Sequence, residues 1–438
     1  MKRSLYTYLF RNRDSFYLYN SQTGFFSEIN ETLFEALFNE DIKSFDPKFI
    51  KHLKDKKIIV EDGHLYDYYH LSRLNHLYSM GNNDILGLTI APTTGCNFAC
   101  PYCFEGNKKD KRMTSETISD IINFINSSNR YKELHITWYG GEPLTAFDII
   151  KSIVLRIRSE CQIPITSQSI VTNGYLLNQD VIAFLKDNQF KNIQITFDGA
   201  ETNHNKTRGL KGNHMPTFHK IMTNLDRIVT ELPENTRISI RVNVNKKNEQ
   251  DFALLYNLIK EKYPQKRNLV VYPGFIRESN TTDMYMCFNS LVGKSRYEFY
   301  KKIQNHGINV DFYPQIYNKG CMACQNSSFI IGPSGELYKC WNDFNHPEKI
   351  VGYIKDRKIT NPSLISQYAC DSNVFYDVKC KDCKIFPVCN GGCTWYRNKN
   401  IYEGKRYDVC SFLVDDTILE ECLLAKPIEK GEKVIKAF

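Results

Sequence analysis

The sequence lacks the features of a membrane protein and of a nucleic-acid-binding protein. No apolar run approaches the length of a transmembrane helix, and the opening residues up to Phe10 are cut off by Arg11 and Arg13 before they could act as a signal sequence. The net charge of +8 arises from 57 basic and 49 acidic residues that are interspersed along the chain, without long basic runs. We therefore expect a cytoplasmic protein with no nucleic-acid partner and no membrane partner.

The sequence is rich in cysteine, with 15 of them in 438 residues. Because the cytosol keeps thiols reduced, we expect metal ligands rather than disulfides. Eleven cysteines fall into three groups, at residues 96–103, 321–340 and 380–410. The remaining four are expected to be buried apolar residues: Cys161, Cys287, Cys370 and Cys422.

The first group, Cys96, Cys100 and Cys103, has C-x3-C-x2-C spacing and directly follows the β-branched run 85–90. We call residues 96–103 the cysteine loop. Three thiolates are one ligand short of a closed zinc or iron-sulfur site, so one iron of a 4Fe-4S cluster would stay free to bind another molecule. The alternative is a zinc knuckle whose fourth ligand lies elsewhere.

Residues 85–315 alternate between short β-branched segments and helical segments, which predicts an α/β fold of six strand-helix units around a parallel sheet. The expected strands are 85–90, 134–139, 168–172, 192–198, 237–244 and 268–276. The expected helices are 114–128, 147–160, 178–188, 217–231 and 249–262. In such folds the chemistry lies where the strands end.

Tyr102 stands directly before the last cysteine of the loop, and Gly140-Gly141-Glu142-Pro143 follows the second expected strand. With the cysteine spacing, these residues resemble the motifs of radical S-adenosylmethionine (SAM) enzymes. The resemblance implies a partial (β/α)6 radical SAM barrel over residues 85–315 and a 4Fe-4S cluster on the cysteine loop. It also implies that SAM chelates the open iron and that one electron cleaves it to a 5'-deoxyadenosyl radical.

Further strand ends extend the resemblance. Residues 171–174 and 195–199 are similar to the TNG and SLDG segments of this family, although Thr196 and Phe197 stand where Ser and Leu are usual. The resemblance implies that Glu142 holds the SAM amino group, Arg208 its carboxylate and Tyr102 its adenine, and Asn243 is expected to point into the barrel. The alternative for Arg208 is a solvated surface residue. The candidate cofactor-binding residues are Tyr102, Gly140, Gly141, Glu142, Asn173, Asp198 and Arg208.

The later cysteines, over residues 316–425, resemble a SPASM domain, with the pattern C-x2-C, G-x4-C, C-x2-C-x5-C-x3-C and a final C. The resemblance implies two auxiliary 4Fe-4S clusters with interleaved ligands. The first set is Cys321, Cys324, Cys340 and Cys393, and the second set is Cys380, Cys383, Cys389 and Cys410. The alternative is a pair of zinc ribbons. Residues 426–438 are expected to be a frayed tail.

Residues 1–84 are expected to form a small leading domain. Alternating aromatic residues up to Phe10 and a hairpin over 15–30 precede helices starting after Asn30 and at Pro47, and a second hairpin is expected over 58–66. The order resembles the winged-helix element that recognises leader peptides in many peptide-modifying radical SAM enzymes. The alternative is a cap that only packs on the barrel.

Two enzyme functions fit this organisation: maturation of a ribosomally made peptide by crosslinking or oxidation, and formylglycine formation by an anaerobic sulfatase-maturating enzyme. In the latter family an aspartate base follows the cysteine of G-x4-C, whereas Trp341 follows Cys340 here. This departure and the leading domain favour the peptide maturase, with flavodoxin or ferredoxin as electron donor and no assigned catalytic residue. A non-catalytic zinc scaffold is the remaining alternative.

Overall fold

The computed structural model describes residues 1–43, 45–81, 84–103, 110–128, 130–245, 248–276, 293–316, 320–389 and 391–425. Cys287 and the expected tail at 426–438 lie outside the described residues. Within these ranges, no helix is long and apolar enough to cross a membrane.

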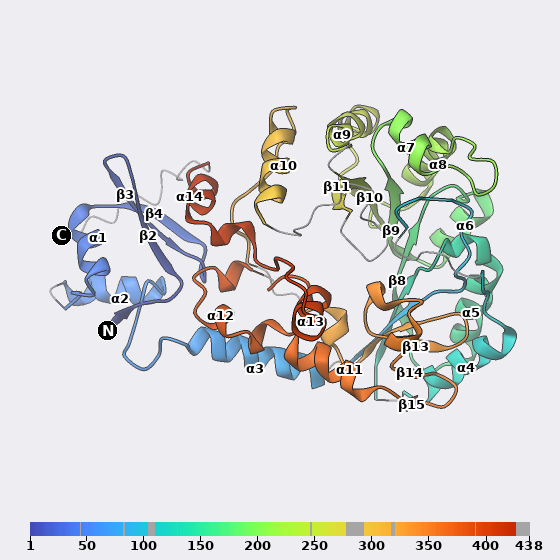
Figure 1. The fold of residues 1–438 in the computed structure, drawn as a ribbon, viewed down its shortest axis with the longest axis horizontal. Helices are drawn as coiled ribbons and strands as arrows, with labels where there is room; N and C mark the ends of the chain where they lie inside the picture. The colour runs from blue at the N-terminus through green and yellow to red at the C-terminus, as the bar shows by residue number, and fades with distance from the viewer. Residues whose placement is uncertain are drawn as a thin grey trace.

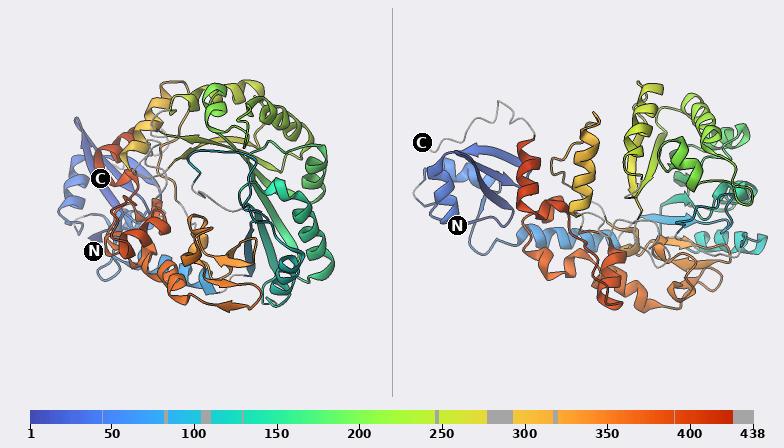
Figure 2. Two further views of the ribbon diagram at one scale, coloured as in Figure 1. Left: turned by 45° about the vertical axis from the view of Figure 1, so that its right-hand side comes forward. Right: turned by 45° about the horizontal axis from the view of Figure 1, so that its top comes forward.

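The largest element is a ten-stranded sheet in the order β11-β10-β9-β8-β7-β6-β12-β13-β14-β15 (Figure 1). Its parallel part runs in sequence order through β6 (Ile85–Ile90), β7 (Glu133–Trp138), β8 (Ile165–Thr172), β9 (Phe190–Phe197), β10 (Arg237–Val244) and β11 (Leu269–Phe275). All six predicted strands are therefore present, and the predicted α/β class with a parallel sheet is confirmed. The sheet curves into an open arc whose outer side is covered by helices (Figure 2).

Apolar and polar side chains alternate along the strands, which explains why helices cover only the outer side of the sheet. In β10, for example, Ile238, Ile240, Val242 and Val244 are at most 1 % exposed and belong to the core shared with the helices. The intervening polar positions therefore face the inner side of the arc. The covering helices are α4 (Ser115–Asn126), α5 (Phe147–Glu160), α6 (Gln179–Asp187), α8 (Phe218–Glu231) and α9 (Asp251–Lys262).

These five helices match the five expected ones, but the sequence prediction missed two others, α7 (Glu201–Thr207) and α10 (Lys294–Gln304). The segment of α7, ETNHNKT, has no apolar periodicity, and only His204 in it is buried. Its helical state is therefore decided by its packing beside β9 and α8 and not by its own pattern.

The C-terminal region continues the sheet and then forms short helices. β12 (Ser328–Ile331) pairs in parallel with β6, and β13 (Glu336–Tyr338), β14 (Gly352–Tyr353) and β15 (Lys358–Ile359) follow antiparallel. The α-helices after them are α11 (Pro362–Ser366), α12 (Val378–Lys381), α13 (Thr394–Tyr402) and α14 (Asp416–Leu424). A π-helical turn, η6 (Gln367–Asp371), directly follows α11, and a 3-10 turn, η4 (Trp341–Asp343), lies between β13 and β14.

The leading segment contains an antiparallel sheet in the order β2 (Thr7–Asn12), β3 (Ser15–Asn20) and β4 (Phe25–Ile29). Helices α1 (Glu31–Phe38) and α2 (Pro47–Asp55) follow, and the Asn30 side chain caps α1 by accepting a hydrogen bond from the Leu33 amide, as expected. The second expected hairpin is wrong. β5 (Ile59–Val60) pairs with β1 (Lys2–Arg3), and a turn at residues 61–64 leads into the long helix α3 (Asp67–Gly81).

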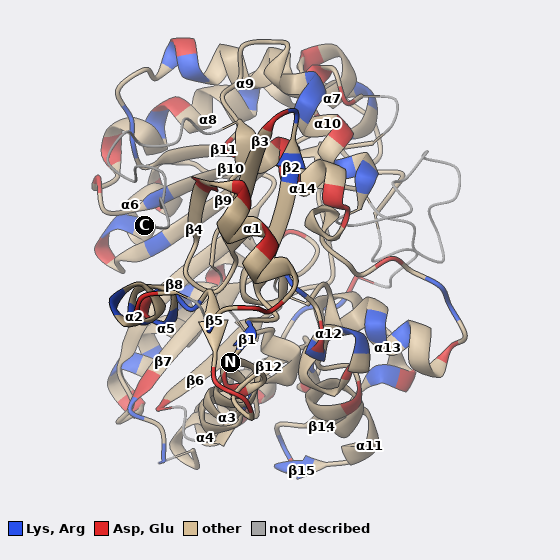
Figure 3. Cartoon of the chain, turned by 90° about the vertical axis from the view of Figure 1, so that its left-hand side faces the viewer, with Lys and Arg blue, Asp and Glu red and all other residues tan. Residues whose placement is uncertain are grey.

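The leading sheet lies at the opposite end of the molecule from β8 and β9 (Figure 1). Its contacts with the C-terminal region include hydrogen bonds from the Tyr8 hydroxyl to Glu420 at 2.7 Å and from the Ser21 hydroxyl to the Lys384 carbonyl at 2.5 Å. Helix α3 adds a bond from the Tyr69 hydroxyl to the Phe375 carbonyl at 2.6 Å. The C-terminal region therefore stands between the leading sheet and the central sheet. In Figure 3, which looks onto this end, both signs of charge are scattered over the elements.

Candidate functional site

The candidate site is built at the edge where the parallel strands end. The cysteine loop follows β6, Glu142 follows β7, Asn173 follows β8, and Asp198 follows β9. Because the carboxyl ends of parallel strands meet at one edge of a sheet, residues that are far apart in sequence are brought together there.

The glycine pair after β7 is pressed against the start of the cysteine loop. A Cβ on Gly140 would lie 2.4 Å from the Thr93 carbonyl oxygen, and one on Gly141 would lie 2.2 Å from the Gly95 carbonyl oxygen. The Gly141 amide donates to the Thr93 carbonyl at 3.2 Å, and the Glu142 amide donates to the Gly95 carbonyl at 2.8 Å. The glycines thus allow the approach of the loop backbone, which has no room for a side chain at either position.

Glu142 is 1 % exposed, and its carboxylate accepts three hydrogen bonds. The donors are the Thr172 hydroxyl at 2.7 Å, the Asn173 amide at 2.7 Å and the Leu144 amide at 3.1 Å. Burial raises the pKa of Glu142 even though these donors oppose the rise. The Asn173 side chain also donates to the Asn97 side chain at 2.8 Å, which ties β8 to the cysteine loop.

A second buried group joins Tyr102, Asp198, Arg208 and Asn243. The Tyr102 hydroxyl donates to Asp198 at 2.5 Å and accepts from the Arg208 guanidinium at 3.1 Å and from the Asn243 amide at 3.2 Å. Arg208 also lies 3.6 Å from Asp198, and the two side chains are 8 % and 1 % exposed. Arg208 is therefore an ion-paired interior residue and not a solvated surface residue.

The residues around the loop fit the cluster and SAM that their pattern implies. Burial raises the pKa of Cys96 to about 12 and that of Cys100 to about 11, so these thiols need a cation to become ligating thiolates. Two buried donors, the Arg208 Nε and the Asn97 Nδ2, have no hydrogen-bond partner in the described part of the chain. Over that same part, no three His, Cys, Asp or Glu side chains converge as in a metal site, so the ligand sets stay predictions from the sequence.

Electrostatic interactions join some of the eight later cysteines within each of the two expected sets. In the first set, burial raises the pKa of Cys340, and nearby Asp343, Cys393 and Cys321 raise it further. A thiol hydrogen bond with Cys324 lowers the pKa of Cys321.

In the second set, burial is the main cause of the raised pKa of Cys383 and of Cys410. Cys389 raises both further, and Cys410 itself adds to the rise at Cys383. Cys389 also adds to the rise of the Cys380 pKa. Thiols that are remote in sequence, such as Cys340 and Cys393, are therefore brought within electrostatic reach of one another.

Asp343, two positions beyond Trp341, is 1 % exposed and fully engaged. Its carboxylate accepts hydrogen bonds from the Tyr368 hydroxyl at 2.7 Å and the Trp395 indole at 3.0 Å. Burial raises the pKa of Asp343 to about 6. Trp341 instead faces the central sheet, with its ring centroid 4.0 Å from that of Tyr139, the residue before Gly140.

The sequence analysis missed three residues on the inner side of the arc. Arg241 of β10 is paired in register with Tyr272 of β11, and its charge also acts on the pKa of Tyr139 after β7. The alternation of Ser239, Arg241 and Asn243 with apolar residues was the signal that could have found Arg241.

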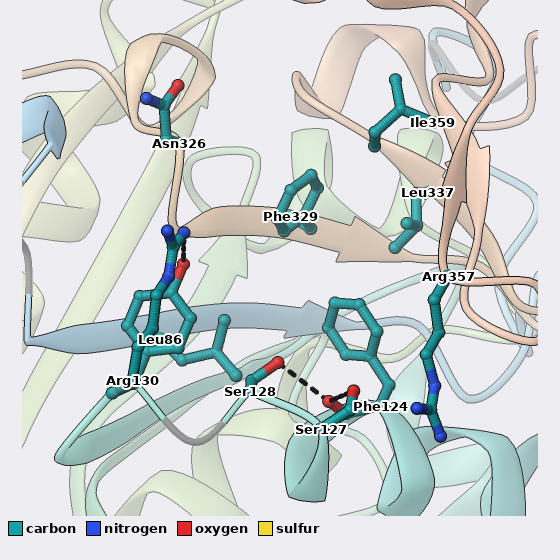
Figure 4. A pocket seen from close by; sticks show the side chains of 11 residues that line it. Leu86, Phe124, Ser127, Ser128, Arg130, Asn326, Phe329, Leu337, Arg357 and Ile359 are labelled. Carbon is teal, nitrogen blue, oxygen red and sulfur yellow. Dashed lines mark hydrogen bonds between the residues drawn. The ribbon is translucent and has the colours of Figure 1, made fainter.

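A separate pocket of about 290 Å³ lies among the start of β6, the end of α4, β12 and β13. Figure 4 shows Leu86, Phe124 and Phe329 in it, with Arg130 and Arg357 on its two sides. Since Leu86 is the second residue of β6, the pocket lies toward the opposite edge of the sheet from the cysteine loop.

Comparison with known proteins places these motifs in a family. The profile described as "Radical SAM superfamily" matches residues 90–259. The cysteine-type anaerobic sulfatase-maturating enzyme of Clostridium novyi (strain NT) is 25 % identical over 356 residues, which cover 73 % of this chain and 90 % of that protein. The radical SAM cyclopropyl synthase TigE of Paramaledivibacter caminithermalis is 24 % identical over 391 residues, which cover 77 % and 78 %.

Solved structures share the fold. Native anSMEcpe with bound AdoMet (that is, SAM) has a TM-score of 0.55 and 19 % identity, covering 78 % of this chain and all of that one. Streptococcus suis SuiB bound to its precursor peptide SuiA has a TM-score of 0.51 and 16 % identity, covering 94 % and 99 %. A radical SAM domain implies a 4Fe-4S cluster and SAM as cofactors. The chain therefore contains a radical SAM domain at residues 90–259.

Proposed function

We propose that the chain is a SPASM-type peptide maturase that abstracts hydrogen from a ribosomally made peptide and forms a crosslink or oxidises a residue. The SAM-bound cluster supplies a 5'-deoxyadenosyl radical for this chemistry when it is present and reduced. The chain's own contribution is to hold the cofactors, orient the peptide and exclude water. The expected cytoplasmic location and the flavodoxin or ferredoxin donor remain predictions from the sequence.

In this proposal the radical SAM core is residues 85–315 and the SPASM domain is residues 316–425. The cysteine loop holds the SAM cluster, and the first and second sets hold two auxiliary clusters. Glu142 receives the SAM amino group, and the unpartnered Arg208 Nε is a donor for its carboxylate. Tyr102 is the proposed adenine contact, with its hydroxyl fixed by Asp198.

The observation that carries the choice of substrate is the surroundings of Cys340. Trp341 stands where the sulfatase-maturating enzymes have their aspartate base, and its ring packs on Tyr139. The nearby Asp343 is buried, with both carboxylate oxygens accepting hydrogen bonds from Tyr368 and Trp395. Neither residue is placed to accept a proton from a substrate, which favours a reaction that does not need that base.

The leading domain, residues 1–84, is the proposed binding site for the peptide leader. Its sheet order leaves β2 and β4 as outer strands, and edge strands are common docking sites for extended peptides. The fold likeness to SuiB, which was solved with its precursor peptide, extends over 94 % of this chain and supports this partner.

Formylglycine formation on a sulfatase is the second candidate, favoured by the similarity to the Clostridium novyi enzyme. The deciding experiment uses anaerobically purified and reconstituted protein with dithionite and SAM. One reaction contains the peptide encoded by a short open reading frame beside the gene, and a parallel one contains a cysteine-bearing sulfatase peptide. Both are analysed by mass spectrometry.

Loss of two hydrogens from the open-reading-frame peptide, together with 5'-deoxyadenosine, supports the maturase. Formylglycine in the sulfatase peptide alone supports the second candidate. Zinc in place of iron, without SAM cleavage, would leave the non-catalytic scaffold.

A further inference from the structure

Arg241 projects from the middle of β10 toward the inner side of the arc. Its neighbours in the strand, Ile240 and Val242, are 0 % exposed and pack against the outer helices. Since successive side chains of a strand point to opposite faces, Arg241 shares the inner face with Asn243. A hydrogen bond from the Arg241 Nε to the Asn243 Oδ1 at 3.0 Å confirms this placement.

The guanidinium is held in a defined position by β11. A Cβ on Gly274 would lie 2.3 Å from the Arg241 Nε and 3.0 Å from its Cζ, so the side chain lies directly over the backbone at that glycine. With Nε used by Asn243, the two terminal nitrogens have no hydrogen-bond partner among the residues that the structure describes and are available to a ligand. Asn243 in turn donates to the Tyr102 hydroxyl at 3.2 Å, so Arg241 adjoins the proposed SAM-binding residues.

Arg241 differs from Arg208 in its charge balance. Arg208 has Asp198 at 3.6 Å, whereas no acidic side chain of the described residues forms an ion pair with Arg241. Its surroundings are aromatic: burial raises the pKa of Tyr139 and Tyr272, and the positive charge of Arg241 opposes the rise in both. A half-buried guanidinium without a counter-ion is a strong binding site for a carboxylate, because the low dielectric strengthens the attraction.

We propose that the terminal nitrogens of Arg241 bind a carboxylate inside the barrel. It is supplied either by the methionine part of SAM, whose carboxylate Arg241 would then share with Arg208, or by an acidic group of the substrate peptide. The peptide source rests on the proposed function, whereas the SAM source does not. In both cases Arg241 sets the position of a reactant next to the cysteine loop.

The test measures binding by equilibrium dialysis with the reconstituted holoenzyme, so turnover of a peptide is not required. The variants are Arg241→Gln, which removes the charge, and Arg241→Lys, which keeps the charge but loses the planar fork. The matched control is Arg237→Gln, which removes an exposed arginine from the other end of the same strand. The probes are SAM, decarboxylated SAM, N-acetyl-glutamate N-methylamide in the presence of SAM, and the glutamine counterpart of that last compound.

If SAM supplies the carboxylate, Arg241→Gln weakens SAM binding about ten- to a hundredfold and leaves decarboxylated SAM unchanged. If the peptide supplies it, SAM binding is unchanged and the variant loses the preference for the glutamate probe over the glutamine probe. In either case Arg241→Lys is intermediate and Arg237→Gln resembles the wild type.

The proposal is overturned if Arg241→Gln, with wild-type iron content and circular dichroism, changes neither the affinity for SAM nor the preference for the glutamate probe over the glutamine probe. Because these readouts are affinities, a failure to modify any peptide would count against the proposed function and leave the carboxylate site intact.

Discussion

Gly141→Ala is expected to separate Glu142 from the cysteine loop. The new Cβ would lie 2.2 Å from the Gly95 oxygen and 2.5 Å from the Thr94 oxygen, both of them backbone atoms that cannot rotate away. Reaching an ordinary carbon-oxygen contact of about 3.3 Å requires a displacement of about 1 Å. That displacement breaks or stretches the two hydrogen bonds that the Gly141 and Glu142 amides donate to the Thr93 and Gly95 carbonyls. At 1–3 kcal/mol for each buried group left unpaired, the free energy of unfolding falls by about 2–6 kcal/mol.

The same shift moves the proposed amino-group ligand relative to the cluster, and a 1 Å misplacement costs about a hundredfold in rate. The assay is 5'-deoxyadenosine production by reconstituted protein, with denaturant unfolding beside it. The matched control is Gly81→Ala at the end of α3, where a Cβ would meet nothing within 4 Å. This control should leave both readouts unchanged or raise stability by up to about 1 kcal/mol. Equal behaviour of Gly141→Ala and Gly81→Ala would refute the reasoning.

Three further predictions concern other parts of the chain. Alanine at all three cysteines of the cysteine loop should lower the iron content by roughly four atoms and abolish 5'-deoxyadenosine; an unchanged iron count would contradict the assignment. Trp341→Ala should lower the free energy of unfolding by about 2 kcal/mol and Trp341→Phe by less, since phenylalanine keeps a ring against Tyr139; equal losses in denaturant melts would exclude a role for this contact. Burial, aided by the charge of Arg208, holds the pKa of His204 well below 6.5. Below about pH 6.5 the unfolded chain therefore binds a proton at this histidine that the folded chain excludes. The free energy of unfolding should fall as the pH drops below that value. Denaturant unfolding between about pH 5 and pH 8 should show a weaker slope for His204→Gln but not for His219→Gln at an exposed histidine; identical slopes would argue against the excluded proton.

Local sequence signals predicted the parts of the fold that are fixed by neighbouring residues. The strand at Ile85–Ile90 and the helix at Phe147–Glu160 have the expected bounds, because each has a clear apolar periodicity of its own. The Asn30 cap was likewise predicted from its own residue type and position. The prediction of a hairpin over 58–66 was wrong because β5 pairs with Lys2–Arg3, some 57 residues away. The local sequence pattern carries no information about a pairing strand that is so remote.

The candidate site was predicted as a set of residue types and not as an arrangement. The cysteine spacing, the glycine pair and Glu142 are short motifs whose chemistry is carried by the residues themselves. The partners of Tyr102 were not predictable, because Asp198 lies 96 positions away and meets it only when β9 takes its place in the sheet. Arg241 was missed for the same reason: its exposure to a ligand depends on Gly274 of the next strand.

The sequence by itself determined the donor atoms, the alternation of strands and helices, and the spacing of the cysteines, since spacing and residue type are local properties. The tertiary structure alone decided which backbone presses on Gly141 and which carboxylate neutralises Arg208. It also decided that Asp343 is buried against Tyr368 and Trp395, and that no acidic side chain of the described residues pairs with Arg241. These outcomes depend on the curvature and register of the parallel sheet, because only the arrangement of its strands in space sets the distances between residues that are remote along the chain.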